Sequence, residues 1–391
     1  MSQFTTPKPG AVTPELHSVL ADLQSQGVRV EKQALAEARS GGAGPSDAGM
    51  MWVEGVPVTF PLSSGFVSRS PFSIREENDG WGLYRESERL AAVTLPPQPR
   101  FYGLSTADGI PYWQLALLHL DSLASTVIQT CIYWGNSDQC RFCGIELSLQ
   151  AGQTTAVKTP RQLAEVARAA RDLDGAVDVT LTTGTTRGPD RGALYVGRCA
   201  AAVKDATGLP VQAQFEPPED LSVLDRVKDS GVDSVGMHVE SFDPAVLAKV
   251  APAKARTGIE GYFRAWERAV QLFGPGQVST YVILGMGEDP EITVRGCQRA
   301  VDAGVYPFIV PLRPVPGSLM QDVPPPAADY MRQVYRQAVP YLRSRGLASW
   351  HVKAGCARCN ACSAMAAFEQ RAGGGEPDGS PRRPLPFTVA R

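Results

Sequence analysis

Strand-like and helix-like segments alternate along this chain from about residue 101 onward, and this alternation limits the possible folds more than any other feature of the sequence. Amphipathic segments such as EDLSVLDRVKDSG and GIEGYFRAWERAVQLFG lie between the strand-like ones. Strands that alternate with helices pair in parallel through right-handed crossovers. Six such units predict an α/β fold, a partial (β/α)6 TIM-like barrel, although periodicity alone does not separate this barrel from an open doubly wound sheet. The strands are expected at residues 125–133, 177–185, 211–217, 232–240, 277–285 and 306–314.

One helix of this series has clear start signals. Thr159 is a good N-cap residue, and Pro160 suits the first helical turn. The apolar residues that follow recur at helical spacing and predict one buried face: Leu163, Val166, Ala167 and Ala170.

The first hundred residues have a different character and are expected to form an N-terminal accessory region. Residues 11–39 resemble two short helices, and residues 41–49 form a glycine-rich loop. The stretch MMWVEGVPVTFPL alternates and breaks at Gly55 and Pro57, which predicts a hairpin. Beyond this region the expected divisions are a barrel at 101–320, a C-terminal helix with a cysteine segment at 321–370, and a glycine-, proline- and charge-rich disordered tail at 371–391.

Composition excludes several classes of function. The 391 residues carry a formal charge of -2, with 43% apolar and 20% charged content, so no basic surface is expected for nucleic acid or anionic lipid. No stretch approaches the roughly eighteen apolar residues of a membrane span. We therefore expect a cytoplasmic protein, in which clustered cysteines are more often metal ligands or catalytic groups than disulfides.

Polar and small residues follow the predicted strands where each one ends. In parallel barrels active sites collect at the carboxyl ends of the strands. A site is therefore expected at this end of the barrel, built from residues that include Cys131, Cys140, Cys143, Thr183, Gly184, Glu216, His238, Glu240 and Gly285.

Three of the eight cysteines lie within the thirteen residues from Cys131 to Cys143, directly after the first predicted barrel strand. A structural zinc site needs four protein ligands, and this group supplies three thiols. A [4Fe-4S] cluster held by three thiolates keeps one iron open for a non-protein ligand. The group therefore favours iron and sulfur over zinc or unliganded thiols.

A second group comprises Cys356, Cys359 and Cys362, with two residues in each gap. The preceding Gly355 relaxes the backbone where a tight turn is needed for three thiols to converge. This spacing favours an auxiliary iron-sulfur cluster. A zinc site with His351 as fourth ligand and a redox thiol set remain alternatives.

Several motifs together resemble those of radical S-adenosylmethionine (SAM) enzymes, in the branch of biotin and lipoyl synthases. They are CRFC at the end of the first cysteine group, TTGT after the second barrel strand, VESFDP after the fourth, YVILGMGED at the fifth and PLRPVPGS at the sixth. The first cysteine gap has eight residues where the superfamily usually has three, yet a bulged loop still lets the thiols converge. More narrowly, SGGAGPSD, STADGIPYW and AGCARCNACSA resemble a bacterial radical SAM family encoded beside nitrilase genes.

This resemblance implies the cofactors and several site residues. It implies a [4Fe-4S] cluster on Cys131, Cys140 and Cys143 that reductively cleaves SAM and starts radical chemistry on a small-molecule metabolite, with flavodoxin or ferredoxin as electron donor. The segment LASWHVKAG resembles a strand that would bring the second group back alongside the barrel, where the group would face either the substrate or an electron-delivery surface. The alternative is a non-catalytic iron-sulfur or zinc barrel with a binding or assembly role. The SAM contacts carried over are Phe142, Thr183, Gly184, Glu240 and Gly285.

Overall fold

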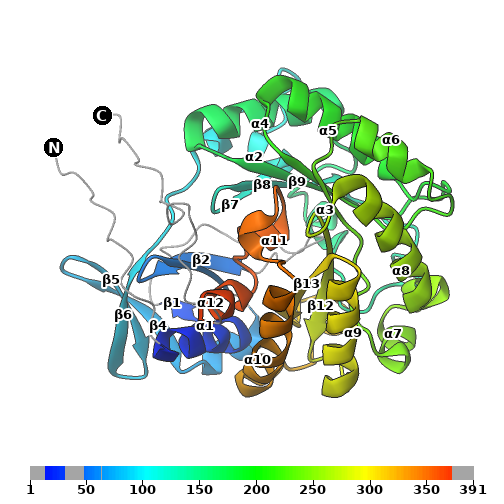
Figure 1. Ribbon diagram of the computed structural model, residues 1–391. Coiled ribbons are helices and arrows are strands. Elements are labelled where there is room, and N and C mark those ends of the chain that lie inside the picture. Colours follow the sequence, from blue (N-terminus) through cyan, green and yellow to red (C-terminus); the bar gives the residue numbers. More distant parts are fainter. Residues whose placement is uncertain (1–13, 31–47, 63, 372–391) are drawn as a thin grey trace.

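A seven-stranded curled sheet forms the centre of the computed structural model, which describes residues 14–30, 48–62 and 64–371 (Figure 1). Its strand order is β13-β12-β11-β10-β9-β8-β7, and the strands from β8 to β13 are all parallel. Within the described ranges no pairing joins β13 to β7, so the barrel stays open, as expected for a partial barrel. The parallel strands are β8 (Ser122–Ile128), β9 (Asp178–Thr183), β10 (Val211–Gln214), β11 (Ser234–Gly236), β12 (Val278–Leu284) and β13 (Val305–Pro311).

All six predicted strands are present, but all six end earlier than expected. The first was predicted to reach Tyr133, whereas β8 ends at Ile128. Beyond it the backbone leaves the ladder, because Gln129 N donates to Ala156 O at 2.8 Å and Ile132 N donates to Thr185 O at 3.0 Å. The sequence did not predict the additional edge strand β7 (Leu117–His119), which runs antiparallel to β8.

Helices cover the outer, convex side of the sheet (Figure 1). The predicted start of α4 (Pro160–Asp174) is confirmed, because Thr159 and Gln162 form a reciprocal capping box. The predicted apolar face of α4 is also buried. The other outer helices are α5 (Ala193–Thr207), α6 (Val223–Asp229), α7 (Pro244–Val250), α8 (Pro252–Phe273), α9 (Pro290–Asp302) and α10 (Ala328–Ser344).

The N-terminal region forms a second sheet of six strands, with the order β1-β4-β5-β6-β2-β3. The predicted hairpin is confirmed as β2 and β3, joined at Glu54 and Gly55, which both have positive φ, as a type I′ turn requires. The predicted second helix is wrong at Arg29–Val30, which form β1 because they pair with β4. Residues 31–47, with most of the predicted glycine loop at 41–49, lie outside the described residues. The elements are α1 (Pro14–Gln26), β1 (Arg29–Val30), β2 (Ala48–Val53), β3 (Val56–Pro61), β4 (Phe72–Glu77), β5 (Gly80–Arg85) and β6 (Glu88–Thr94).

After α10 the chain returns to the barrel, and α11 lies within the arc of the seven-stranded sheet (Figure 1). The strand expected at LASWHVKAG is wrong: Ser349–His351 form a 3-10 helix, and the following backbone bonds to side chains instead of to a neighbouring strand. The predicted tail at 371–391 lies, except for its first residue, outside the described residues. The remaining short elements are η1 (Gly65–Arg69), η2 (Arg100–Gly103), α2 (Tyr112–Leu115), α3 (Leu147–Gln150), η3 (Ser349–His351), α11 (Cys356–Cys359) and α12 (Met365–Arg371).

None of the helices described is both long and apolar enough to cross a membrane.

Candidate functional site

The first cysteine group lies in the long loop between β8 and α3, at the carboxyl end of the barrel. Cys131 N donates to Glu146 Oε1 at 3.0 Å, which closes the loop on itself. Arg141 N donates to Val250 O at 2.8 Å and so ties the loop to the end of α7. These contacts fix the loop at both of its cysteine-bearing ends.

Burial shapes the chemistry of the three thiols. It raises the pKa of Cys143 to about 12 and raises the pKa values of Cys131 and Cys140. Cys143 is an electrostatic neighbour of both other thiols. In the described chain, however, no three Cys, His, Asp or Glu side chains already stand around one point as metal ligands. A metal that bound to these thiols would release their protons.

Thr183 and Gly184 end β9 directly beside this loop. A Cβ atom at Gly184 would lie 2.0 Å from Thr130 O and 3.1 Å from Ile145 Cδ1, so only glycine permits the close approach of the two chains. Gly184 N also donates to Ile128 O at 2.8 Å, and the Thr183 hydroxyl donates to Gly184 O at 2.9 Å. The glycine of TTGT therefore has a packing role against the residue before Cys131.

Glu240 follows β11 in a strained conformation, with φ of 69°. Its backbone is held on β12, because Ile283 N donates to Glu240 O at 2.8 Å and Glu240 N donates to Tyr281 O at 3.1 Å. Its carboxylate accepts a hydrogen bond from Lys254 Nζ at 2.6 Å. The backbone hydrogen bonds to β12 and the side-chain hydrogen bond from Lys254 thus stabilise a backbone angle that a non-glycine residue rarely adopts.

Lys254 was not predicted from the sequence. Its ammonium also donates to His238 O at 2.6 Å, and only 10% of its side chain is exposed. Burial acts to lower the pKa of Lys254, but Glu240 raises it, and the net result lies well above the ordinary value. Lys254 is therefore charged. The sequence offers one hint of this pairing with Glu240. Lys254 lies in the first turn of a helix, fourteen residues after the glutamate that follows a strand.

Two further polar residues point toward this end of the barrel. The Tyr133 hydroxyl donates to Glu216 Oε2 at 3.4 Å, and burial raises the pKa of Tyr133 to about 12. His238 Nδ1 accepts a hydrogen bond from Tyr281 N at 3.2 Å, whereas its Nε2 is buried without a partner among the described residues. Burial lowers the pKa of His238 to about 3, so the ring is neutral and carries its proton on Nε2.

Gly285 ends β12 with φ of 100°, and a Cβ atom there would lie 2.8 Å from Pro326 Cδ. Gly285 N and Met286 N donate to the two Glu288 carboxylate oxygens at 2.7 and 2.8 Å. This glycine therefore allows a tight turn under the segment before α10. Phe142 lies half-buried in the cysteine loop, with part of its ring against the core.

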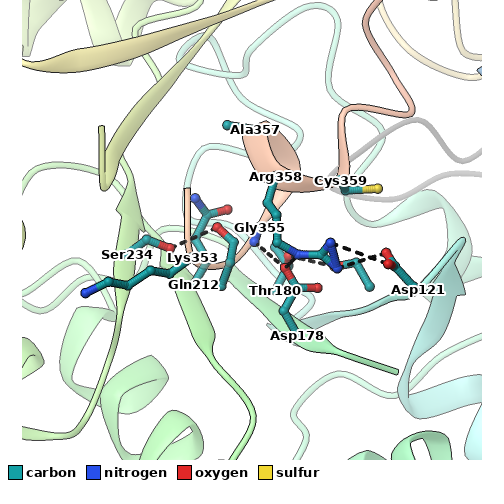
Figure 2. Close-up of polar contacts among 12 residues, drawn as sticks. Asp121, Asp178, Thr180, Gln212, Ser234, Lys353, Gly355, Ala357, Arg358 and Cys359 are labelled. Atoms are coloured by element: carbon teal, nitrogen blue, oxygen red, sulfur yellow. Dashed lines mark hydrogen bonds and ion pairs between the residues drawn. The ribbon is translucent and has the colours of Figure 1, made fainter. Parts of the chain in front are cut away.

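The segment that leads into the second cysteine group is anchored at the opposite, amino end of the strands, and Figure 2 shows the contacts of Gly355 there. Gly355 N donates to Asp178 Oδ2 at 2.8 Å, and Asp178 is the first residue of β9. Ser234 Oγ, at the first residue of β11, donates to Ala354 O at 2.9 Å. From this anchor the group extends into the barrel, because Cys356 reaches Gln214, the last residue of β10, and Cys362 lies near Arg313, which follows β13.

An arginine within the second group, Arg358, pairs with two carboxylates. Arg358 Nε donates to Asp178 Oδ2 at 2.7 Å, and Arg358 Nη2 donates to Asp121 Oδ1 at 2.9 Å (Figure 2). Asp178 has a fully buried side chain. Burial raises the pKa of Asp178, whereas Arg358 opposes that rise. No local pattern predicts these two pairings, because the paired residues are separated by 180 and 237 positions.

The predicted role of Gly355 in a tight turn is confirmed. Its φ is 99°, and a Cβ atom would lie 2.0 Å from Gln212 Oε1. The single turn α11 then carries Cys356 and Cys359, and Cys362 follows after a left-handed Asn360. The three thiols thus come from one short stretch fixed on the floor of the barrel.

The family model of the radical SAM superfamily matches residues 135–300. This range begins in the cysteine loop and ends in α9. This part of the chain, which is less than half of its 391 residues, therefore matches a radical SAM domain. Members of this superfamily use a [4Fe-4S] cluster and SAM, and the domain with its enzyme relatives indicates that the chain is an enzyme.

A curated protein with a matching segment is the bacteriochlorophyllide c C-7(1)-hydroxylase of Chlorobaculum limnaeum. It is 35% identical over 125 residues, which cover 32% of this chain and 31% of that protein. The match thus spans about a third of the curated relative's length.

Solved structures of radical SAM proteins are also similar to this chain. A methylornithine synthase has a TM-score of 0.45 at 15% identity, covering 68% of this chain and 78% of its own. A radical SAM methyltransferase from Sphaerobacter thermophilus has a TM-score of 0.43 at 14% identity, covering 71% and 76%. The hydrogenase maturase HydG has a TM-score of 0.43 at 16% identity, covering 57% and 48%.

The residues at the carboxyl end of the barrel fit the superfamily's cofactors in their chemistry. Three thiols from one loop are the donor set that leaves a [4Fe-4S] cluster one open iron. A charged Lys254 and a buried carboxylate at Glu240 stand at the same end. Such groups complement a ligand that carries amino, carboxylate and hydroxyl groups.

Proposed function

We propose that this protein is a radical SAM enzyme that acts on a small-molecule metabolite. The observation that supports it best is the convergence at one barrel end of the loop with Cys131, Cys140 and Cys143 and of the strand ends at Gly184 and Glu240. The cysteine loop contacts the end of β9 at Gly184, so two parts of the proposed site lie next to each other.

In this proposal the three loop cysteines hold the [4Fe-4S] cluster as thiolates. When bound, the cluster supplies the electron for reductive cleavage of SAM. Glu240 accepts hydrogen bonds from the SAM ribose or faces its sulfonium, and Lys254 orients that carboxylate through its hydrogen bond. Phe142, Thr183, Gly184 and Gly285 complete the proposed SAM contacts.

The finer assignments belong to the same proposal. The motifs favour the branch of biotin and lipoyl synthases and, within it, the family encoded beside nitrilase genes. A flavodoxin or ferredoxin delivers electrons, and the protein functions in the cytoplasm without nucleic acid or membrane partners. We propose that the chain has three functional segments. Residues 1–100 have an accessory role, residues 101–320 carry the SAM chemistry, and residues 321–370 carry the second cysteine group.

An anaerobic SAM cleavage assay tests the first cysteine group. Reconstituted, dithionite-reduced protein should convert SAM to 5′-deoxyadenosine, and the Cys131→Ala/Cys140→Ala/Cys143→Ala variant should lose this activity and the iron of this site. Cys199→Ala is the matched control, because Cys199 is a buried thiol on α5. Full 5′-deoxyadenosine production by the triple variant would refute the assignment.

Glu240 is tested separately from the cluster. Glu240→Ala should weaken SAM binding while iron content stays intact. Unchanged SAM affinity in equilibrium dialysis would remove Glu240 from the site.

We propose that Cys356, Cys359 and Cys362 hold an auxiliary iron-sulfur cluster. Metal analysis of anaerobically purified protein should find about eight irons per chain, as two [4Fe-4S] clusters require. About four irons with one zinc would instead support a structural zinc site at the second group.

The alternative function, a non-catalytic metal-binding barrel, predicts a different result in the same assay. Such a protein would bind iron or zinc but would not release 5′-deoxyadenosine on reduction with SAM. The cleavage assay therefore separates the two classes directly.

A further inference from the structure

The concave face of the sheet can be identified from one contact. Gln212 Nε2 on β10 donates to Ser279 Oγ on β12 at 3.2 Å, although β11 lies between these two strands. Side chains that meet across an intervening strand must lie on the inner face of a curled sheet. Because side chains alternate along a strand, Gln214 and Tyr281 lie on this inner face too.

Several side chains on the inner face of the sheet are partly exposed. Along β12, Tyr281 and Ile283 are partly exposed, whereas their strand neighbours are buried. Along β8, Thr126 and Ile128 show the same alternation. The barrel interior is therefore not fully packed by its own side chains between the two cysteine groups.

Cys356 projects from the amino end into this interior. Gln214 Nε2 donates to Cys356 Sγ at 3.4 Å, and the Tyr281 hydroxyl is also hydrogen-bonded to Cys356. Gln214 and Tyr281 each donate a hydrogen, from an N–H and an O–H group, and such donors to a sulfur stabilise negative charge on it.

The Tyr281 ring connects the second group to the opposite end of the barrel. Its edge meets the His238 ring at a centroid distance of 4.6 Å, and Phe308 packs against it at 5.1 Å. His238 lies two residues before Glu240, the proposed SAM contact. A continuous line of inner-face side chains thus joins Cys356 to the SAM end.

We infer that the second cysteine group faces the barrel interior, where Gln214 and Tyr281 donate hydrogen bonds to the Cys356 sulfur and tune the group that it ligates. This inference rests on the proposed function, which places the substrate in the same interior. The second group then acts on the substrate side of the barrel and not at an electron-delivery surface. Arg358 and Asp178 close the floor beneath it.

Hydrogen bonds to cluster sulfurs favour the more negative, reduced state and so raise the reduction potential. Loss of one hydrogen bond to a charged sulfur changes the ratio of reduced to oxidised cluster by about tenfold. Tyr281→Phe and Gln214→Leu should each lower the reduced-to-oxidised ratio of the second cluster by about that factor at a fixed redox poise. The signal of the first cluster should not change.

Potentiometric electron paramagnetic resonance of the reconstituted full chain measures both clusters, and the Cys131→Ala/Cys140→Ala/Cys143→Ala variant isolates the signal of the second. Tyr281→Phe preserves the ring contacts and is the more conservative variant. Tyr195→Phe is the control, because the Tyr195 hydroxyl donates to Lys158 O outside the barrel interior. Proton couplings to the second cluster that exchange in deuterium oxide should also decrease in Tyr281→Phe.

An unshifted second signal in both variants would overturn the inference, and so would zinc at this site in place of iron. Failure of the proposed function appears differently. In that case 5′-deoxyadenosine is not formed, whereas the shifts of the second signal persist, because they require no turnover.

Discussion

Arg358 provides a quantitative test of how the second cysteine group is held. Arg358→Met retains the apolar length of the side chain but leaves Asp178 without its cation. The Arg358 side chain is 12% exposed and that of Asp178 is 0% exposed, so the pair is buried. Removal of one partner from a buried pair costs about 3–5 kcal/mol. This loss should appear first as local opening of the C-terminal segment, because the pair joins that segment to β9.

Hydrogen exchange of peptides that span residues 352–365 measures this opening. A cost of about 3–5 kcal/mol corresponds to exchange that is faster by between about a hundredfold and a few thousandfold. Arg345→Met is the matched control, because Arg345 pairs with Asp302 at 2.9 Å on the surface. A surface pair contributes about 0–1 kcal/mol. Equal exchange in the two variants would show that the buried pair does not hold the segment, and our reasoning would be wrong.

Three further predictions concern the carboxyl end of the barrel. Gly184→Ala places a methyl group against the cysteine loop and should reduce iron at the first group, whereas Gly103→Ala, which has open space, should not; equal iron contents would contradict this. Lys254→Met should weaken SAM binding as Glu240→Ala does, and the double variant should bind no worse than Glu240→Ala alone; an additive loss would mean that Lys254 acts independently. His238 has a pKa of 6.5 when unfolded and about 3 when folded, so stability should fall as pH drops through this window. Urea unfolding at about pH 5 should show at most about 2 kcal/mol less stability than at about pH 7 from this residue, and His238→Asn should not show that loss.

The barrel was predictable because its information is local. Strand and helix periods differ, so the order of six units could be read from short windows, and the cap at Thr159 needs only the residues up to Gln162. Gly55 likewise marks its hairpin within a few residues, whereas Pro57, the other expected break, lies within β3 and pairs with Trp52. Strand ends were less predictable, because Ile128 and Tyr133 differ in backbone partners and not in strand propensity.

The arrangement of the second group could not be read from the sequence. The spacing of Cys356 and Cys359 indicates a common site, but nothing local indicates which barrel end receives it. That choice depends on contacts of Arg358 with Asp121 and Asp178, which are remote in sequence. The same applies to Lys254, whose role depends on a pairing with Glu240 that only the folded barrel creates.

The backbone at Ala361 joins the two ends of the described chain. Its carbonyl accepts hydrogen bonds from Thr59 N and Oγ1 at 2.9 and 3.0 Å and from Gln24 Nε2 at 3.2 Å, across 302 and 337 positions of sequence. Contacts of such separation form late, because loop closure must come before any gain from them. During synthesis the second cysteine group therefore has its final surroundings only after residues 24, 59 and 361 have come together. In our proposal, iron-sulfur insertion at this site follows that contact, whereas the first cysteine loop, with its anchors at residues 146 and 250, is complete after a shorter length of chain.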